Sequence, residues 1–287
     1  RCPEIWNAPG LNGFLRDLVY QTSQDRCDFV FSRMIDPPSI QGYLFDKTNY
    51  TNSDGIQVAM LFSAGVDSLA GAVMEVVLGR RRTMLVSHRP ANQVYARQRD
   101  LAAAIGKRVG RSNQPLHAAV EVNKGKRDDR SYPHQLRSFL FGSVAATIAQ
   151  ALGLGGIRMY DNGITSLNLP CSPQIVGSRV SRSTHPRVLR AMSTFFTELF
   201  GKPFSVDNPL QPQTKEQVFR TIRAANAAPF ARPLAVAFAR VRRVSGNHTV
   251  VAALNAPIRL NQEKRPAKAR GTKASPLFEL TKPAMPA

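Results

Sequence analysis

Met60-Leu-Phe-Ser-Ala-Gly-Val-Asp-Ser-Leu-Ala-Gly-Ala72 joins an apolar run to a helical pattern through a loop of small residues. The apolar run, Gln57 to Phe62, is too short for a helix and long enough for a buried strand. Beyond the loop, apolar residues recur at helical spacing, at Val66, Leu69, Ala70, Val73, Val76 and Val77. Free backbone N–H groups and the helix dipole attract anions at such a helix start. We therefore predict an anion-binding loop at residues 63–68; the alternative is an ordinary turn between a strand and a helix.

This loop is not a Walker A motif, because that motif requires Gly-Lys followed by Ser or Thr. The Gly-Lys pairs of the chain are all followed by other residues, at Gly106-Lys107, Gly125-Lys126 and Gly201-Lys202. Between strand and helix the loop offers small side chains and one acid, Asp67.

Strand and helix patterns alternate regularly from Gln57 to about Ala225. Strand candidates lie at 57–62, 83–88, 118–123, 157–160 and 204–206, and helix candidates at 66–78, 92–105, 138–152, 187–200 and 215–224. Strands that alternate with helices of this length indicate βαβ units. We therefore predict an α/β, Rossmann-like fold: a parallel sheet with helices on both faces. Ligands of such sheets bind outside the carboxyl ends of the strands, where the loop is expected to lie.

Two flanking regions lack this alternation of strands and helices. Residues 1–55 read as an N-terminal extension, with helical spacing from Leu11 to Val19 and a strand at Cys27–Ser32. Residues 227–287 read as an irregular, basic, Pro-containing tail with 7 of the 20 prolines. Such a segment buries too little apolar surface to offset its ordering entropy. We expect most of the tail to be loosely packed or disordered.

The net charge of +20 raises the possibility of nucleic-acid binding. The tail carries 11 of the 39 Lys and Arg residues and 2 of the 19 acids, and the rest of the chain has no obvious basic helix. A basic body suits a phosphate-rich substrate, or solubility alone. Nucleic acid is therefore not the expected partner.

The three cysteines, Cys2, Cys27 and Cys171, are far apart and form no Cys-x-x-Cys pair. This spacing argues against a disulfide framework and against a self-contained zinc site. No run is apolar enough to span a membrane, and no charged-then-apolar leader is visible. We expect a cytoplasmic protein with no membrane partner.

Arg137 opens an apolar helix, where a positive charge is unfavourable to the helix dipole. Such a placement favours an arginine that reaches a phosphate, and the alternative is a solvated arginine beside Asp128 or Asp129. Asp161, Asn162 and Gly163 follow another strand. Asn-Gly is first of all a turn signal, yet short acids and amides at that edge are able to hold the polar edge of a heterocycle.

Arg182 and His185 lie in a basic, polar segment just before a helix. Arginines next to a helix start suit phosphates. The alternative is a structural role, in which Ser183 or Thr184 caps the helix. His185 has no neighbouring cysteine or second histidine, so no metal site is expected there.

Ser63-Ala-Gly-Val-Asp-Ser68 resembles the pyrophosphate-binding loop Ser-Gly-Gly-x-Asp-Ser of the N-type ATP pyrophosphatases. Three further motifs follow in the same order as in one family: Arg-Ser-Phe-Leu-Phe from Arg137, Asp-Asn-Gly-Ile-Thr-Ser-Leu-Asn-Leu-Pro from Asp161, and Thr-His-Pro-Arg from Thr184. Together they resemble the 7-cyano-7-deazaguanine synthase (QueC) family, and more closely its QueC-like relatives in Qat-type anti-phage operons.

This resemblance implies that residues 56–226 form a PP-loop ATP pyrophosphatase domain with the adenine nucleotide alpha hydrolase-like fold. It implies an ATP-dependent ligase that adenylates the carboxylate of 7-carboxy-7-deazaguanine, or acts in a related defence reaction, and releases AMP and pyrophosphate. Ammonia would convert the product toward 7-cyano-7-deazaguanine. A protein partner from the same operon is a further expectation.

Carried over by position, ATP and Mg²⁺ would lie on Phe62, Ser63, Ala64, Gly65, Val66, Asp67, Ser68, Leu69, Ala70, Gly71 and Ala72. Asp67, Ser68 and Arg137 would act on the phosphates. The substrate would meet Asp161, Asn162, Gly163, Arg182 and His185. The family also holds structural zinc through C-terminal cysteines, but this chain has no cysteine after Cys171.

Two other functions remain open at this stage. One is an ATP-binding, QueC-like protein that has lost turnover, because Ala64 replaces a glycine of the motif and the zinc cysteines are absent. The other is an RNA-binding module that depends on the basic tail.

We predict that Ala64→Gly strengthens ATP binding. A β-carbon restricts positive φ at this position and crowds a phosphate, and glycine removes both constraints. Calorimetry of ATP binding to both proteins checks this prediction, and weaker binding by the glycine variant would contradict it.

Overall fold

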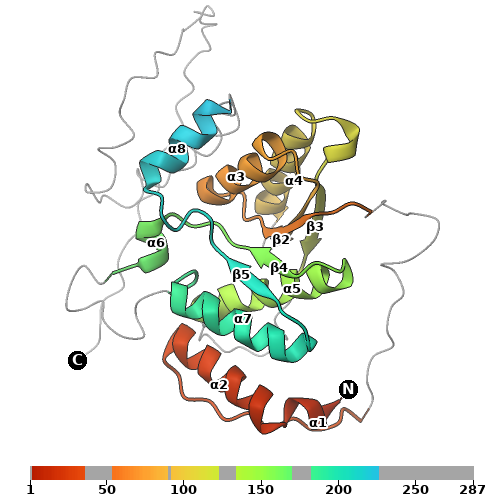
Figure 1. Ribbon diagram of the computed structural model, residues 1–287, viewed down its shortest axis with the longest axis vertical. Coiled ribbons are helices and arrows are strands. Elements are labelled where there is room, and N and C mark those ends of the chain that lie inside the picture. Colours follow the sequence, from red (N-terminus) through yellow and green to blue (C-terminus); the bar gives the residue numbers. More distant parts are fainter. Residues whose placement is uncertain (1, 36–53, 90–91, 123–133, 170–181, 226–287) are drawn as a thin grey trace, which may run out of the picture. The chain divides into compact units, whose positions relative to one another are not determined.

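Five parallel strands form one sheet in the order β3-β2-β1-β4-β5 (Figure 1). They are β1 (Val58–Leu61), β2 (Thr83–His88), β3 (Leu116–Val120), β4 (Gly156–Arg158) and β5 (Ser205–Asp207). This computed structural model describes residues 2–35, 54–89, 92–122, 134–169 and 182–225, all within one compact unit. The predicted α/β class with a parallel sheet is confirmed.

Helices cover both faces of this sheet (Figure 1). They are α1 (Pro3–Trp6), α2 (Pro9–Ser23), α3 (Val66–Ala72), α4 (Asn92–Gly106), α5 (Arg137–Ala151), α6 (Gly163–Leu167), α7 (Pro186–Phe200) and α8 (Lys215–Ala224). Short 3₁₀ turns lie at Arg111–Asn113 and His134–Leu136, and α3 continues directly into a π-helix, η2 (Val73–Leu78). Among the described helices, none combines the length and apolar character needed to cross a membrane.

The two central strands β1 and β2 each contribute to two separate apolar clusters, because successive side chains point to opposite faces. Ala59 packs with α5 and α7, whereas the next residue, Met60, packs with α3, α4 and α8. In β2, Met84 likewise packs in the cluster of Ala59, and Leu85 packs in the cluster of Met60. This double burial explains why the strands read as continuous apolar runs rather than as alternating patterns.

The order of the strands reverses at β1. The chain first extends the sheet on one side through β2 and β3, then returns to pair β4 with β1 and adds β5. At such a reversal the carboxyl ends of two neighbouring strands open a crevice in which ligands bind. Here the two neighbouring strands are β1 and β4, and the loops that follow them lie at this reversal.

The predicted strand at Cys27–Ser32 is wrong. This segment contains no strand; instead, asparagine side chains of the neighbouring helices bind its backbone. Asn7 exchanges two hydrogen bonds with Phe31 (2.7 and 2.9 Å), and Asn12 donates to the carbonyl of Phe29 (2.9 Å). Alternate residues do pack toward the core beside α2, so the period of two is present, although no strand of the described residues pairs with this segment.

The predicted helix over residues 66–78 changes its winding at Val73, where η2 begins. Glu75 in this π-helical segment is almost fully buried, and its carboxylate accepts hydrogen bonds from Tyr160 (2.5 Å), Arg81 (2.6 Å) and Arg158. Burial alone would raise the pKa of Glu75, but these hydrogen bonds and the charge of Arg158 lower it below the ordinary value. The network ties the helix after β1 to β4.

The predicted tail, residues 227–287, lies outside the described residues.

We predict that Gly71→Ala destabilises the fold by about 1–3 kcal/mol, the usual cost of overpacking a core. A β-carbon at Gly71 would lie 2.3 Å from the Tyr160 ring, which is itself held by Glu75. Denaturant unfolding measures the loss. Gly142→Ala is the matched control, because its β-carbon would meet only the Met192 side chain, with the sulfur at 3.5 Å and Cε at 3.9 Å. Equal stability of Gly71→Ala and the parent would contradict this packing.

Candidate functional site

The loop after β1 presents its serines around an uncapped helix start. Gly65 is the N-cap of α3 and has no side chain to accept from the first-turn N–H groups. Ser63 Oγ accepts a hydrogen bond from the Gly65 N–H (3.2 Å) and lies 3.1 Å from Ser68 Oγ, which donates to the Gly65 carbonyl (3.1 Å). Ser63 is exposed, so this ring of small groups opens to solvent.

Ala64 adopts a φ of 61°, in the left-handed region that glycine reaches without strain. For an alanine this conformation costs about 1–2 kcal/mol. Its side chain is buried with the core cluster beside α3, so the methyl group packs inward. A gain in ATP affinity on Ala64→Gly would therefore have to come from backbone freedom rather than from space beside a phosphate.

Most of the other residues predicted to hold ATP are buried as packing. Six of them have almost no exposed surface: Phe62, Val66, Leu69, Ala70, Gly71 and Ala72. Such residues offer a ligand backbone N–H groups at most. The side chains able to meet a phosphate at this loop are therefore the two serines, with Asp67 beside them.

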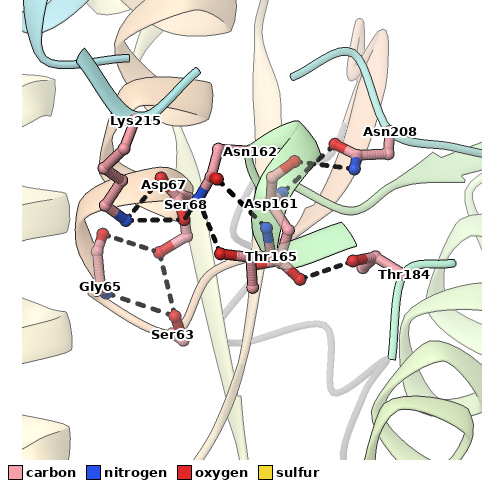
Figure 2. Close-up of polar contacts among 10 residues, drawn as sticks. All are labelled: Ser63, Gly65, Asp67, Ser68, Asp161, Asn162, Thr165, Thr184, Asn208 and Lys215. Carbon is pink, nitrogen blue, oxygen red and sulfur yellow. Dashed lines mark hydrogen bonds and ion pairs between the residues drawn. The ribbon is translucent and has the colours of Figure 1, made fainter. Parts of the chain in front are cut away.

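Asp67, the second residue of α3, accepts hydrogen bonds on both carboxylate oxygens (Figure 2). Lys215 Nζ lies 2.9 Å from each oxygen, and Asn162 Nδ2 donates to Oδ2 at 3.1 Å. Lys215 is the first residue of α8, where Thr214 and Gln217 form a capping box that fixes the start of the helix. The ion pair thus brings a cation beside the loop and joins α8 to α3.

Asn162 links the two loops of the crevice. Its side-chain oxygen caps α6 by accepting from the Thr165 N–H (3.2 Å), while its amide donates to Asp67 and to Thr165 Oγ1 (2.8 Å). Gly163 is needed for close packing, since a β-carbon there would lie 2.3 Å from the Gln211 carbonyl. The Asn-Gly pair, which indicated a turn, therefore starts a short helix.

Asp161 is held from two sides at the end of β4. Thr184 Oγ1 donates to its carboxylate (2.8 Å), and Asn208 bonds its main-chain N–H and carbonyl at 3.2 and 2.8 Å (Figure 2). Burial raises the pKa of the Asp161 carboxyl above its ordinary value. The charge of Asp67 raises this pKa further, while the Thr184 hydrogen bond and the Lys215 charge oppose the rise.

Arg137 is not among the partners of Asp67, which in the described chain are Lys215 and Asn162. It is exposed at the start of α5, close enough to His88 for its charge to add to the burial that lowers the His88 pKa. The structure thus places Arg137 at the end of β2 rather than at the Asp67 carboxylate.

His185, not Ser183 or Thr184, is the N-cap of α7, and its Nδ1 accepts from the Arg187 N–H (3.2 Å). Burial and the charges of Arg182 and Arg187 lower the pKa of His185. Thr184, one of the two alternative caps considered for this helix, instead donates its hydroxyl to Asp161. Arg182 and His185 are therefore near the site because Thr184, which lies between them in the chain, bonds Asp161.

Lys215 and Asn208 belong to the site but were missed in the sequence. A signal for Lys215 was present, because a lysine in a first helical turn opposes the helix dipole just as Arg137 does. Asn208 follows a short strand and carries no local signal. In the described residues no group of three or more histidine, cysteine or acidic side chains is placed to hold a metal ion.

Comparison with models of known protein families finds no match to the chain, and comparison with curated proteins finds none either.

We predict that Asp161→Asn becomes progressively more stable than the parent as the pH rises. The folded protein holds the Asp161 proton at pH values where the unfolded chain, with an ordinary pKa of 3.8, has lost it. Parent stability therefore falls as the pH rises from 3.8 through the raised pKa, and the amide has no such dependence. Urea unfolding at several pH values measures the difference; a difference that grows toward acid would contradict the assignment.

Proposed function

We propose that this chain is an ATP-dependent enzyme that holds the phosphates of ATP at the loop Ser63–Ser68. The observation that carries the proposal is the uncapped start of α3 at the crevice between β1 and β4, with the Lys215 ammonium beside it. Free N–H groups and a positive helix end suit a phosphate. The lysine adds the charge that the sequence had assigned to Arg137.

Each group around the loop has a role that its chemistry permits. The Ser63 hydroxyl is able to donate to a phosphate oxygen, and the Ser68 hydroxyl is able to do so by turning away from the Gly65 carbonyl. Lys215 supplies a compact positive charge with three donors. Fixed donors of this kind stabilise charge that develops on a departing pyrophosphate. Mg²⁺ belongs to this scheme as part of the substrate, bound to the phosphates of ATP.

The finer proposal is the adenine nucleotide alpha hydrolase-like fold and a ligase of the 7-cyano-7-deazaguanine synthase type. A substrate carboxylate oxygen attacks the α-phosphorus, the α–β bond breaks, and pyrophosphate leaves. Ammonia then displaces AMP and yields the amide. The reaction needs no nucleophile from the protein, and the polar groups of Asp161 and Asn162 lie at the adjoining strand end, where a heterocycle would bind.

The test is the release of pyrophosphate from ATP in the presence of 7-carboxy-7-deazaguanine and ammonium. We expect AMP and pyrophosphate in equal amounts, and neither when the acid is replaced by its 7-cyano product. Release of ADP and phosphate would contradict cleavage between the α and β phosphates. ATP binding without any cleavage would favour the alternative, a QueC-like protein that has lost turnover; RNA binding without ATP binding would favour the basic RNA-binding module.

A further inference from the structure

Groups of the protein already make three hydrogen bonds to the Asp67 carboxylate. Lys215 bonds both of its oxygens, and Asn162 adds a third hydrogen bond to one of them. Only 10% of the Asp67 side chain is exposed, which leaves little room for another ligand. The family resemblance implied that Asp67 is among the residues that hold the phosphates and their magnesium ion.

A magnesium ion does not fit at this carboxylate. Mg²⁺ needs free oxygen ligands at short distance in nearly octahedral geometry. At Asp67 both oxygens face an ammonium group, and a divalent cation brought to the same oxygens would be repelled by it. The Asp67 carboxylate thus suits the Lys215 ammonium rather than a metal ion.

Lys215 is held at both ends. Its backbone lies in the capped first turn of α8, and α8 is anchored by Val218 and Ile222 in the core cluster beside α3. Its ammonium is held by Asp67. A lysine stem is otherwise flexible, and ordering it costs entropy on binding. The side chain remains 44% exposed. Two of its three N–H donors are directed to Asp67, and within the described residues the third has no acceptor, so it suits a ligand.

We propose that Asp67 is a positioning residue that holds the Lys215 ammonium beside the phosphate loop, rather than a ligand of the magnesium ion. This inference rests on the proposed binding of ATP at the loop. Asp67 acts through Lys215: it orients the ammonium toward the phosphates before ATP arrives. The magnesium ion enters on the phosphates and gains no bond from Asp67.

The test compares ATP affinity in the full chain across a range of magnesium concentrations, by calorimetry. The proteins are the parent, Asp67→Asn, Lys215→Met and the double variant. Arg220→Met removes an exposed cation from the same helix, and Asp100→Asn removes an exposed acid from α4. These two controls match the charge changes without touching the loop.

We expect Asp67→Asn and Lys215→Met each to weaken ATP binding by about 10- to 100-fold, the usual effect of a hydrogen bond to a charged group. The double variant should bind no more weakly than Lys215→Met alone, because Asp67 has no further role. The magnesium concentration for half-maximal binding should be the same in Asp67→Asn and the parent. Both controls should bind like the parent.

A higher magnesium requirement in Asp67→Asn overturns this inference, as does a double variant whose loss equals the product of the two single losses. Either result leaves ATP binding at the loop intact. A parent protein with no affinity for ATP overturns the proposed function itself.

A second measurement needs no nucleotide. The rate at which an amine-specific reagent labels Lys215, relative to exposed Lys107, should rise in Asp67→Asn because the ammonium has lost its partner. Mass spectrometry of the labelled protein provides this ratio. An unchanged ratio means that Asp67 does not hold the lysine, and overturns the inference.

Discussion

The reversal of strand order at β1 is the constraint on which the rest of the site depends. It sets the carboxyl ends of β1 and β4 side by side, so the loop of Ser63–Ser68 and the loop of Asp161–Asn162 share one crevice. Two buried layers hold these strands from both faces, and the Glu75 network ties the helix after β1 to β4. The polar groups that the crevice brings together come from segments that are remote in the sequence, including α8.

Much of the fold could be predicted because its signals are local. The strand at Thr83–His88 and the helix at Lys215–Ala224 have the predicted bounds, since an apolar run or a helical period is complete within one segment. The failures have non-local causes. At Cys27–Ser32 the alternation is present, but a strand also needs a partner strand, and here asparagine side chains of α1 and α2 bind the backbone. The π-helical turn after Val73 coincides with the buried partners that Glu75 finds on β4.

The site was predictable only in part, for the same reason. The small residues between β1 and α3 identify an anion-binding loop without any knowledge of the remaining chain. Lys215 lies 148 residues from Asp67, and only the return of the chain through β4 and β5 brings them together. Arg137 and Lys215 each lie at a helix start, against the helix dipole, so the local sequence does not distinguish between these two cations. In the folded chain α8 starts beside Asp67, so the cation at this carboxylate is Lys215.

The most direct test of this account is a crystal structure of the chain with a non-hydrolysable ATP analogue. The account predicts terminal phosphates within hydrogen-bond distance of the Ser63 and Ser68 hydroxyls and the first-turn N–H groups of α3. It also predicts that the Lys215 ammonium contacts a phosphate while still bonded to Asp67. Phosphates bound elsewhere on the chain, or a magnesium ion coordinated by Asp67 with Lys215 displaced, would contradict it.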